Sequence, residues 1–565
     1  MKVLIIGGVA GGATAAARLR RNDEHAQIIL FERGGFVSFA NCGLPYYVGG
    51  VIREKSDLVV QTPEGFSRRF RIDVRPMEQV VSINRGEKTV SVRKNGSVYR
   101  ESYDKLILSP GAEPIRPALP GFDGKRVFSV RGIPDALAIR EFCERNSLES
   151  AVIIGGGYIG IEMVENLSRL GIRVTVVEQK NHIIPAVDPD MAAEVQNYLR
   201  SKGVELRLNT GVGAIEETGD RLVFHLTDGP DIAADFAVLS VGVSPESKLA
   251  AEAGLKTGGR GTIAVDESMR TSDPDIYAVG DAVQVTNAVS GEPVSIPLAS
   301  PANRQGRIAA DHICGESVRY DGAQGSSILK VFDLVLAATG LSETALKAVG
   351  TPYRKSYTYS PSNASYYPGG APMSIKLLFS PDSGRLLGAQ AVGSSGVDKR
   401  IDVIASVLRM HGTVEDLTRL ELCYAPPFSS AKDPVNMAGF VMENLLTGKV
   451  RQFHWHDVAK VQKNENALLL DTRTQNEYAA GHIPGAVHIP LDSLRERLSE
   501  IDRSKALYVY CQSGLRSYIA CRVLSQNGFD CRNLSGGYRL YEIITGSRSF
   551  DGSLSYPCGI KAPEV

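Results

Sequence analysis

The sequence carries no net charge, because 63 lysines and arginines balance 63 aspartates and glutamates. A chain without net charge has no bulk attraction for nucleic acid or for an anionic membrane surface, so neither is expected as a partner. No run of about 18 consecutive apolar residues is present, the length that a membrane-spanning helix needs. Met1 leads directly into an apolar strand and a glycine turn, which leaves no room for a signal peptide. We therefore expect a cytoplasmic protein.

Paired cysteines are also missing. No C-x2-C pair occurs, so zinc or iron–sulfur ligation is not expected and no metal site is predicted. Cys42 has no second cysteine beside it, so it can hold a mixed disulfide, a persulfide or a sulfenic acid but cannot close an internal dithiol pair. This excludes the chemistry of reductases with a C-x4-C pair. The eight cysteines stand at positions 42, 143, 314, 423, 511, 521, 531 and 558.

An apolar strand at the N-terminus leads into a glycine turn and an alanine-rich helix. Gly7 and Gly12 lie in this turn, although Val9 occupies the usual second glycine position. Glycines there let the backbone approach a pyrophosphate, which binds at the helix N-terminus. Glu32 ends the next strand and is placed to bind a ribose hydroxyl. The pattern predicts a dinucleotide-binding βαβ unit.

The same pattern returns with an intact fingerprint at Gly155, Gly157 and Gly160, and the following strand ends at Glu178. A carboxylate there accepts from a ribose 2′-hydroxyl and repels a 2′-phosphate, so NADH is favoured over NADPH. Two such units in one chain imply two dinucleotides. We predict an α/β fold with two nested Rossmann-like units, the second inserted into the first.

Three further segments support a flavin site in the first unit. They are the strand and turn that end at Gly111, the return crossing at residues 239–245, and the strand that leads to Gly280 and Asp281. At these residues the first ~445 positions resemble the two-dinucleotide flavoprotein disulfide reductase superfamily. The resemblance implies that the first unit binds FAD, that Asp281 contacts it, and that Tyr158 is the ring that covers the flavin until nicotinamide displaces it.

Cys42 follows the flavin unit and begins a Gly-Leu-Pro turn, a place that can present a side chain to a ligand. A helix N-terminus there would stabilise a thiolate. The string Ser38-Phe-Ala-Asn41-Cys42 resembles the S-F-x-x-C motif of coenzyme A disulfide reductases, NADH peroxidases and NADH oxidases. By that resemblance Cys42 is the single redox cysteine on the flavin face.

Two tyrosine-bearing loops in the third region resemble the coenzyme A disulfide reductase branch. They carry Tyr366 and Tyr367 in one loop and Tyr424 in the other. The resemblance implies that one tyrosine from each loop approaches the substrate sulfur, where a hydroxyl can protonate a leaving thiolate. Which of the two adjacent tyrosines acts stays open. We expect a homodimer in which Tyr424 serves the other subunit, and Arg18 is a candidate for the coenzyme A phosphates.

The C-terminal region repeats strand and helix and contains Cys511-Gln-Ser-Gly-Leu-Arg516 at the start of a helix. It resembles a rhodanese domain. A loop of backbone N–H groups there lowers the pKa of a cysteine and stabilises a persulfide, with Arg516 as an anion contact. Asp471 and Arg473 are expected to be structural partners. Cys521 and Cys531 are expected in the core.

These segments predict five parts of the chain. They are an FAD-binding domain at 1–112 and 246–325, an NAD-binding domain at 113–245, an α+β dimerisation domain at 326–446, a linker at 447–454 and a rhodanese domain at 455–565.

A flavin–thiol reductase fused to a sulfur-transfer domain indicates a shared sulfur substrate. The whole chain resembles fused coenzyme A disulfide reductase–rhodanese proteins, which implies NADH- and FAD-dependent reduction of coenzyme A persulfide or polysulfide sulfur. Three alternatives stay open: coenzyme A disulfide reduction for thiol homeostasis, peroxide or oxygen reduction through a Cys42 sulfenate, and a sulfurtransferase or sulfur carrier. Neither persulfide nor disulfide is singled out by the residues alone.

Overall fold

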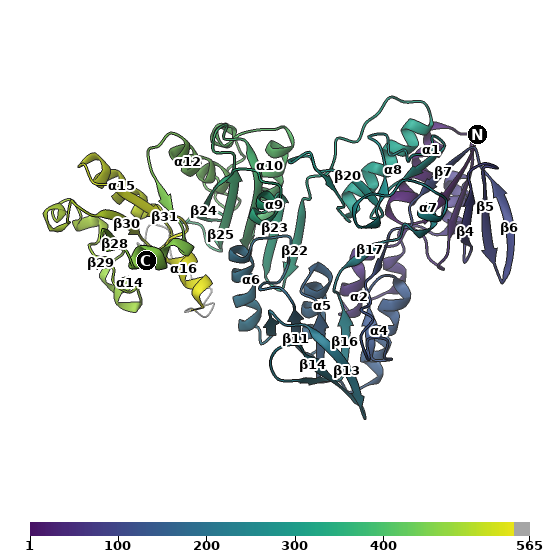
Figure 1. The fold of residues 1–565 in the computed structure, drawn as a ribbon, viewed down its shortest axis with the longest axis horizontal. Coiled ribbons are helices and arrows are strands. Elements are labelled where there is room, and N and C mark those ends of the chain that lie inside the picture. The colour runs from purple at the N-terminus through teal and green to yellow at the C-terminus, as the bar shows by residue number, and fades with distance from the viewer. Residues whose placement is uncertain (547–565) are drawn as a thin grey trace. The chain divides into compact units, whose positions relative to one another are not determined.

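The computed structural model describes residues 1–546, and this part of the chain divides into two compact units. The first contains residues 1–183 and 204–325, and the second contains residues 184–203 and the chain from residue 326 onward. Figure 1 follows the chain from the purple N-terminus to the yellow end of the described residues. Among these residues, no helix combines the length and the apolar character that crossing a membrane requires. Cys558 lies outside the described residues.

The first unit begins with a parallel sheet of strand order β19-β7-β1-β2-β3. All its strands except the edge strand β3 are nearly continuous apolar runs, as expected where helices cover both faces. α1 (Ala10–Asn22) packs against α8 (Ala299–Ile313). α1 starts earlier than the sequence indicated, because Gly11 and Gly12 join the helix. The strands are β1 (Lys2–Ile6), β2 (Gln27–Glu32), β3 (Asp73–Pro76), β7 (Lys105–Leu108) and β19 (Ile276–Ala278).

A second parallel sheet in the same unit has the order β12-β11-β10-β16-β9. In this sheet β10 leads into a glycine turn and helix α5, and β11 follows. The same order links β1, the first glycine turn, α1 and β2. The prediction of two nested nucleotide-binding units is therefore confirmed. The elements are β9 (Val127–Ser129), α4 (Ile133–Arg145), β10 (Ser150–Ile154), α5 (Tyr158–Arg169), β11 (Arg173–Glu178), β12 (Glu205–Leu208) and β16 (Phe236–Leu239).

The inserted unit is joined to the first by two crossing strands. β8 (Ala112–Pro114) leaves the first sheet and β17 (Val243–Pro245) returns to it, and the two pair antiparallel. The smaller elements are α2 (Leu44–Val48), α3 (Pro63–Phe70), β4 (Gln79–Asn84), β5 (Thr89–Lys94), β6 (Ser97–Ser102), β13 (Val212–Thr218), β14 (Arg221–Leu226), β15 (Ile232–Ala234), α7 (Lys248–Glu252), β18 (Ile263–Ala264), β20 (Val283–Thr286) and β21 (Pro293–Val294).

The second unit contains an antiparallel sheet of order β22-β23-β26-β25-β24. Helix α6 (Pro189–Ser201) follows β11 in the chain, yet it belongs to this unit, and Figure 1 shows it in blue among green elements. The sequence did not indicate this placement. The other elements are β22 (Ser327–Val331), β23 (Leu334–Gly340), α9 (Glu343–Ala348), β24 (Arg354–Pro361), β25 (Pro372–Phe379), β26 (Leu386–Gly393), α10 (Val397–Arg409), α11 (Val414–Arg419) and α12 (Pro434–Leu446).

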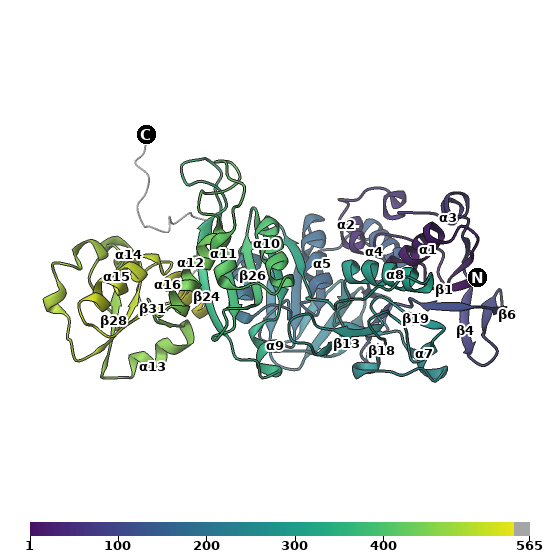
Figure 2. The same cartoon turned by 90° about the horizontal axis from the view of Figure 1, so that it is seen from above.

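The C-terminal part of this unit is a parallel sheet of order β27-β31-β30-β28-β29. Figure 2 shows β28 and β31 between helices α13 and α15. β27 lies inside the segment that the sequence indicated as a linker, and it pairs with β31, so the linker ends in this sheet. The elements are β27 (Gln452–Phe453), α13 (Val458–Gln462), β28 (Ala467–Asp471), α14 (Gln475–Ala480), β29 (Val487–His488), β30 (Ala506–Tyr510), α15 (Leu515–Gln526), β31 (Cys531–Leu534) and α16 (Gly537–Thr545).

Candidate active site

The Cys42 thiol lies in an exposed single turn, Asn41–Gly43, that leads into α2. The loop is fixed to the first nucleotide unit, because the Ser38 N–H donates to the Gly8 carbonyl over 2.7 Å. Ser38 has a φ of +47°, a left-handed conformation that non-glycine residues adopt at a cost and often near functional sites. Sequence and backbone geometry thus agree that this loop presents a side chain.

The electrostatics of Cys42 differ from the expected thiolate stabilisation. Partial burial raises the pKa of the Cys42 thiol, and the nearby carboxylates of Glu162 and Asp281 raise it further. The following helix α2 has only five residues, so its N-terminus does little to stabilise a Cys42 thiolate. From the protein groups alone, Cys42 is held toward its protonated thiol form.

Glu162, which sequence reasoning missed, lies on α5 of the second nucleotide unit. Burial raises the pKa of Glu162 to about 7, and the neighbouring Glu165 adds to the shift. Burial and the same two carboxylates raise the pKa of Tyr46, one turn beyond Cys42, to about 12. Glu162 lies four residues after Tyr158 and therefore on the same face of α5. This spacing was the signal in the sequence that could have identified Glu162.

The two nucleotide units hold their carboxylates in the same way. Glu32 accepts from the Gly8 N–H over 3.0 Å and from the Gly34 N–H over 2.8 Å. Glu178 accepts from the Gly156 N–H over 2.8 Å and from the Lys180 N–H over 2.9 Å. Each carboxylate therefore holds its glycine turn in place through a hydrogen bond. Glu32 and Glu178 are also the residues that the sequence predicted to contact a ribose.

The glycine turns themselves fit a pyrophosphate. Within the described chain, no side chain caps α1 or α5, and helix N-termini of this kind bind anions. A Cβ on Gly12 would collide with the Gly7 carbonyl, and a Cβ on Gly160 would collide with the Gly155 carbonyl, so both turns require glycine. A Cβ on Gly157 would meet its first neighbour at 4.0 Å, which leaves room beside the turn.

Gly111 and Asp281 lie at the two places predicted to close the flavin site. Gly111 has a φ of +77° and precedes the crossing strand β8. The N–H of Gly280 donates to the buried side chain of Gln305 over 2.8 Å, which orients the turn that carries Asp281. Burial raises the pKa of Asp281. A partly buried carboxyl in this position is suited to hydrogen-bond a polyol hydroxyl.

Arg18, the candidate for coenzyme A phosphates, is paired inside the first unit. Its Nε donates to Asp311 of α8, and Asn22 donates to the same carboxylate over 2.7 Å. The guanidinium charge is thereby largely compensated. A phosphate contact by Arg18 stays a prediction.

In the second unit, the tyrosine loops meet through their hydroxyl groups. Tyr366 and Tyr424 form a hydrogen bond to each other and are 73% and 46% exposed. This hydrogen bond raises the pKa of Tyr424. The neighbouring Tyr367 instead donates its backbone N–H to the Ala364 carbonyl. Tyr366 is therefore the member of the adjacent pair that lies with Tyr424.

A buried arginine joins the two tyrosine loops. Arg400 of α10 donates to the Ser362 carbonyl of the first loop over 3.0 Å and to the Phe428 carbonyl of the second over 3.1 Å. It also pairs with Asp433 over 3.0 Å. The Ala364 N–H adds a direct backbone hydrogen bond from the first loop to the second. The two loops that carry the tyrosine pair are thus held together by the Arg400–Asp433 ion pair and by backbone hydrogen bonds.

The C-terminal loop surrounds the Cys511 sulfur with donors. The Gly514 N–H donates to Sγ over 3.1 Å and the Ser517 hydroxyl over 3.3 Å. The first turn of α16 holds the same loop from behind, because the Tyr538 N–H donates to the Cys511 carbonyl over 2.8 Å. Donors aimed at one sulfur stabilise a thiolate or a persulfide anion.

The structural assignments around this loop are confirmed. Arg473 pairs with Asp471 over 2.7 Å, and both side chains are buried. Cys521 and Cys531 are buried in the same part of the fold. Arg516, predicted to contact an anion, instead forms two parallel hydrogen bonds of 2.7 Å each with Glu477.

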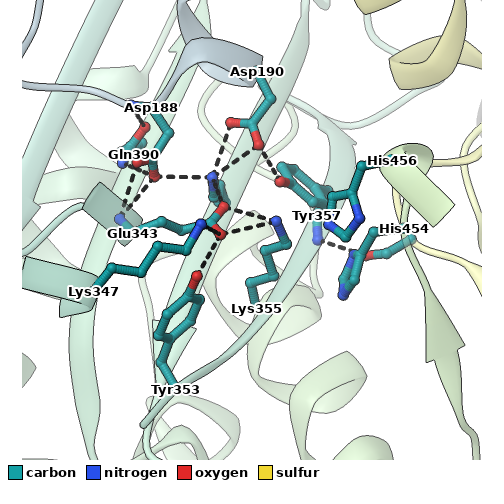
Figure 3. Close-up of polar contacts among 12 residues, drawn as sticks. Asp188, Asp190, Glu343, Lys347, Tyr353, Lys355, Tyr357, Gln390, His454 and His456 are labelled. Atoms are coloured by element: carbon teal, nitrogen blue, oxygen red, sulfur yellow. Dashed lines mark hydrogen bonds and ion pairs between the residues drawn. The ribbon is translucent and has the colours of Figure 1, made fainter. Parts of the chain in front are cut away.

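A further group of charges, also missed from the sequence, lies beneath the antiparallel sheet. The Lys376 side chain is 0% exposed and its ammonium pairs with Asp188 and Asp190 over 2.9 Å each and with Glu343. Figure 3 shows the three carboxylates directed toward one centre. Tyr357 of β24 donates to Asp190. The trio has the geometry of a cation site, and the Lys376 ammonium pairs with all three carboxylates.

Comparison with known proteins agrees with this arrangement. The family model described as pyridine nucleotide-disulphide oxidoreductase matches residues 1–306, its dimerisation domain matches 326–434, and a rhodanese-like domain matches 455–543. A coenzyme A disulfide reductase of Staphylococcus aureus is 36% identical over 442 residues, which cover 78% of this chain and 99% of that protein.

Two solved structures are similar over nearly the whole chain. Reduced Bacillus anthracis CoADR-RHD is 48% identical with a TM-score of 0.95, covering 97% of this chain and 98% of the other. An NAD-dependent persulfide reductase from A. fulgidus is 38% identical with a TM-score of 0.89, covering 96% of this chain and 100% of the other. Both similarities include the C-terminal part.

Proposed function

Since the chain belongs to the pyridine nucleotide-disulphide oxidoreductase family and carries a rhodanese-like domain, we propose that it reduces coenzyme A persulfide with NADH. In the proposed reaction, NADH, one proton and the persulfide give NAD⁺, the coenzyme A thiol and hydrogen sulfide. The family and the relatives support a flavoprotein that reduces sulfur compounds.

One observation favours a persulfide above all. The same chain that carries the exposed Cys42 loop also holds the Cys511 sulfur among the Gly514 and Ser517 donors. Reduction of a disulfide needs no sulfur-transfer site. A cysteine that stabilises a bound sulfur atom has a use where the substrate is sulfane sulfur.

FAD, when bound, passes an electron pair from the nicotinamide to sulfur. Its pyrophosphate is assigned to the uncapped N-terminus of α1 and its ribose to Glu32. Asp281, after the turn held by Gln305, takes the ribityl hydroxyls. The second unit takes the nicotinamide dinucleotide, with its pyrophosphate at α5 and its ribose at Glu178. A buried carboxylate at that place favours NADH.

Cys42 is assigned the attack on the substrate. Its thiolate attacks a sulfur of the persulfide, and the S–S bond breaks. Either sulfide leaves and a mixed disulfide with coenzyme A remains, or the coenzyme A thiol leaves and Cys42 keeps the persulfide. Two electrons from NADH and two protons then restore the Cys42 thiol and release the second product. Glu162, with a pKa of about 7, is a nearby group that can exchange protons at neutral pH.

The Tyr366–Tyr424 pair is assigned to the leaving sulfur. Its hydroxyls can donate to a departing thiolate. The loops belong to the region matched by the dimerisation domain, so we propose a homodimer in which these tyrosines serve the Cys42 site of the other subunit. An active monomer would contradict this assignment.

The experiment compares four oxidants side by side in one NADH oxidation assay: coenzyme A persulfide, coenzyme A disulfide, polysulfide and hydrogen peroxide. The proposal expects the highest kcat/KM with coenzyme A persulfide, and a lower value with NADPH than with NADH. A higher kcat/KM with peroxide would reject the proposal.

Coenzyme A disulfide is the second candidate substrate. The tyrosine pair and the 36% identity to a coenzyme A disulfide reductase favour it. The same assay separates the two, because a disulfide reductase would release two thiols and no sulfide for each NADH.

A further inference from the structure

Arg516 lies two residues beyond Gly514, at the edge of the Cys511 loop. Its guanidinium forms an ion pair with the Glu477 carboxylate. Both terminal nitrogens donate to the two carboxylate oxygens of Glu477 over 2.7 Å, the bidentate geometry that is strongest for this pair. Arg516 is only 7% exposed. Among the described residues its Nε has no hydrogen-bond partner. A small anion in the loop would therefore meet a guanidinium whose charge is already balanced by a carboxylate.

Glu477 is held in place by its own helix. It is the third residue of α14, and its carboxylate accepts from the Thr474 N–H over 2.9 Å in a capping box. Burial would raise the pKa of Glu477, but the hydrogen bonds from Arg516 and Thr474 outweigh burial and lower the pKa to about 2. The ion pair therefore persists throughout the neutral range.

The rim beside the loop is apolar. Leu515 and Ile519 are 37% and 39% exposed. Their spacing of four residues on α15 places them on one face, next to the start of the helix. An uncharged thiol chain matches such a rim better than a dianion does.

We propose that Glu477 determines donor specificity at Cys511: by neutralising Arg516, it makes the site discriminate against small dianionic sulfane donors such as thiosulfate and favour persulfides of larger thiols. This inference rests on the proposed sulfur transfer at Cys511. In either transfer the Cys511 thiolate attacks the outer sulfur, the donor S–S bond breaks, and sulfite or a thiolate leaves. Cys511 keeps the persulfide, and no external electrons are needed.

The test is Glu477→Gln in the full-length protein. Glutamine keeps the capping box at this position but removes the negative charge, so Arg516 gains an uncompensated positive charge. Sulfur transfer from thiosulfate to cyanide is measured as thiocyanate. We expect the KM for thiosulfate to fall on the order of fivefold at low ionic strength, and the difference to shrink at high salt. The KM for N-acetylcysteamine persulfide, whose tail is uncharged, should not fall.

Two further variants isolate the charge of Arg516. Glu465→Gln makes the same charge change at an exposed site before β28. That site lies at the opposite end of the parallel strands from Cys511, about 16 Å away by strand length, and should leave the KM unchanged. The double variant Glu477→Gln/Arg516→Gln should not show the lower KM for thiosulfate. Thermal unfolding of each variant verifies the fold.

The outcomes separate the inference from the proposed function. An unchanged thiosulfate KM in Glu477→Gln, an equal fall in Glu465→Gln, or a gain that persists in the double variant rejects the inference alone. A wild type that transfers no sulfur from the persulfide rejects both the role of Cys511 and the inference.

Discussion

The pKa of Cys42 is raised by burial and by two carboxylates, and Glu162 makes the larger contribution of the two. Burial raises the Cys42 pKa, and the negative charge of Glu162 raises it further. Because the pKa of Glu162 is about 7, this charge appears as the pH passes through neutrality. The Cys42 thiol therefore becomes harder to ionise in the same range where an isolated cysteine begins to do so.

Glu162→Gln should speed alkylation of Cys42 by iodoacetamide about two- to fivefold at pH 7.5, because it removes a nearby negative charge. The rate is read from the Cys42 peptide by mass spectrometry, since Cys423 is also exposed. Glu141→Gln, on the exposed face of α4, serves as the control. The alkylation rate of Cys42 is measured as a function of pH in both proteins. Identical pH dependence of this rate in wild type and Glu162→Gln would contradict the account.

The same residue gives a stability prediction. A carboxyl whose folded pKa is raised stabilises the protein below its unfolded pKa of about 4.5, and this contribution is lost as the pH rises through about 7. Glutamine does not ionise, so the melting temperature of Glu162→Gln should fall less than that of wild type between pH 5 and pH 8. A parallel pH dependence of both proteins would argue against a raised pKa at Glu162.

At the scale of elements, α6 joins the antiparallel sheet through the buried charges around Lys376. Burial would raise the pKa of Glu343, but Lys376 and Lys355 outweigh it and hold the pKa well below 4.5. The stabilising contribution of Glu343 is thus present above pH 4.5 and is lost as the pH falls. Asp188 and Glu343 are far apart in sequence, so only the folded chain brings them together.

Lys376→Met should cost about 3–5 kcal/mol of unfolding free energy at pH 7, because it removes the cation that Asp188, Asp190 and Glu343 share. Among the described residues, only Glu343 of the three keeps a close cation, Lys355. The loss should shrink toward acid pH, where those carboxyls can take up protons. Urea denaturation at pH 5 and pH 8 measures both effects. Lys460→Met, at an exposed position of α13, is the control. A loss that does not depend on pH would contradict this reading of the charge cluster.

The contacts of Arg400 with the two tyrosine loops give a second prediction at this scale. Arg400→Lys keeps a charge for Asp433 but cannot reach both loop carbonyls, so the Tyr366–Tyr424 pair should shift. Activity on thiol-linked substrates should fall tenfold or more, the order expected when a reacting group moves by about 1 Å. NADH oxidation with ferricyanide, which needs only the nucleotide units, should be unchanged. Equal losses in both assays would indicate a general folding defect.

How far the sequence predicts this molecule differs between its parts. The glycine turns with Glu32 and Glu178, the Cys42 loop and the Cys511 loop were predicted, because their chemistry depends on residues close together in the chain. The placement of α6, the Tyr366–Tyr424 contact and the Arg516–Glu477 pair were not. These depend on tertiary packing between distant segments, which local periodicity does not encode. Arg516 is paired with Glu477, and its predicted contact with a substrate anion stays a prediction.

For the whole molecule, the proposed function assigns sulfur transfer to Cys511 and sulfur reduction to Cys42. Cys511→Ser should block use of polysulfide far more than use of preformed coenzyme A persulfide. In the proposed function the Cys511 loop holds a sulfur atom and Cys42 receives the electrons of NADH, so preformed persulfide already carries the sulfur that Cys42 would attack. Steady-state NADH oxidation on both substrates decides this. Equal losses would reject independent access to Cys42, and no loss on either would reject a role for Cys511 in reduction.

The central claim is that Cys42 passes electrons from NADH to the sulfur of coenzyme A persulfide. The most direct test measures NADH consumed, sulfide released and coenzyme A thiol formed in one reaction, for wild type and Cys42→Ser. The account predicts one sulfide and one thiol for each NADH in wild type. In Cys42→Ser it predicts normal FAD content and NADH binding without sulfide release. Sulfide release by Cys42→Ser at near the wild-type rate would contradict it.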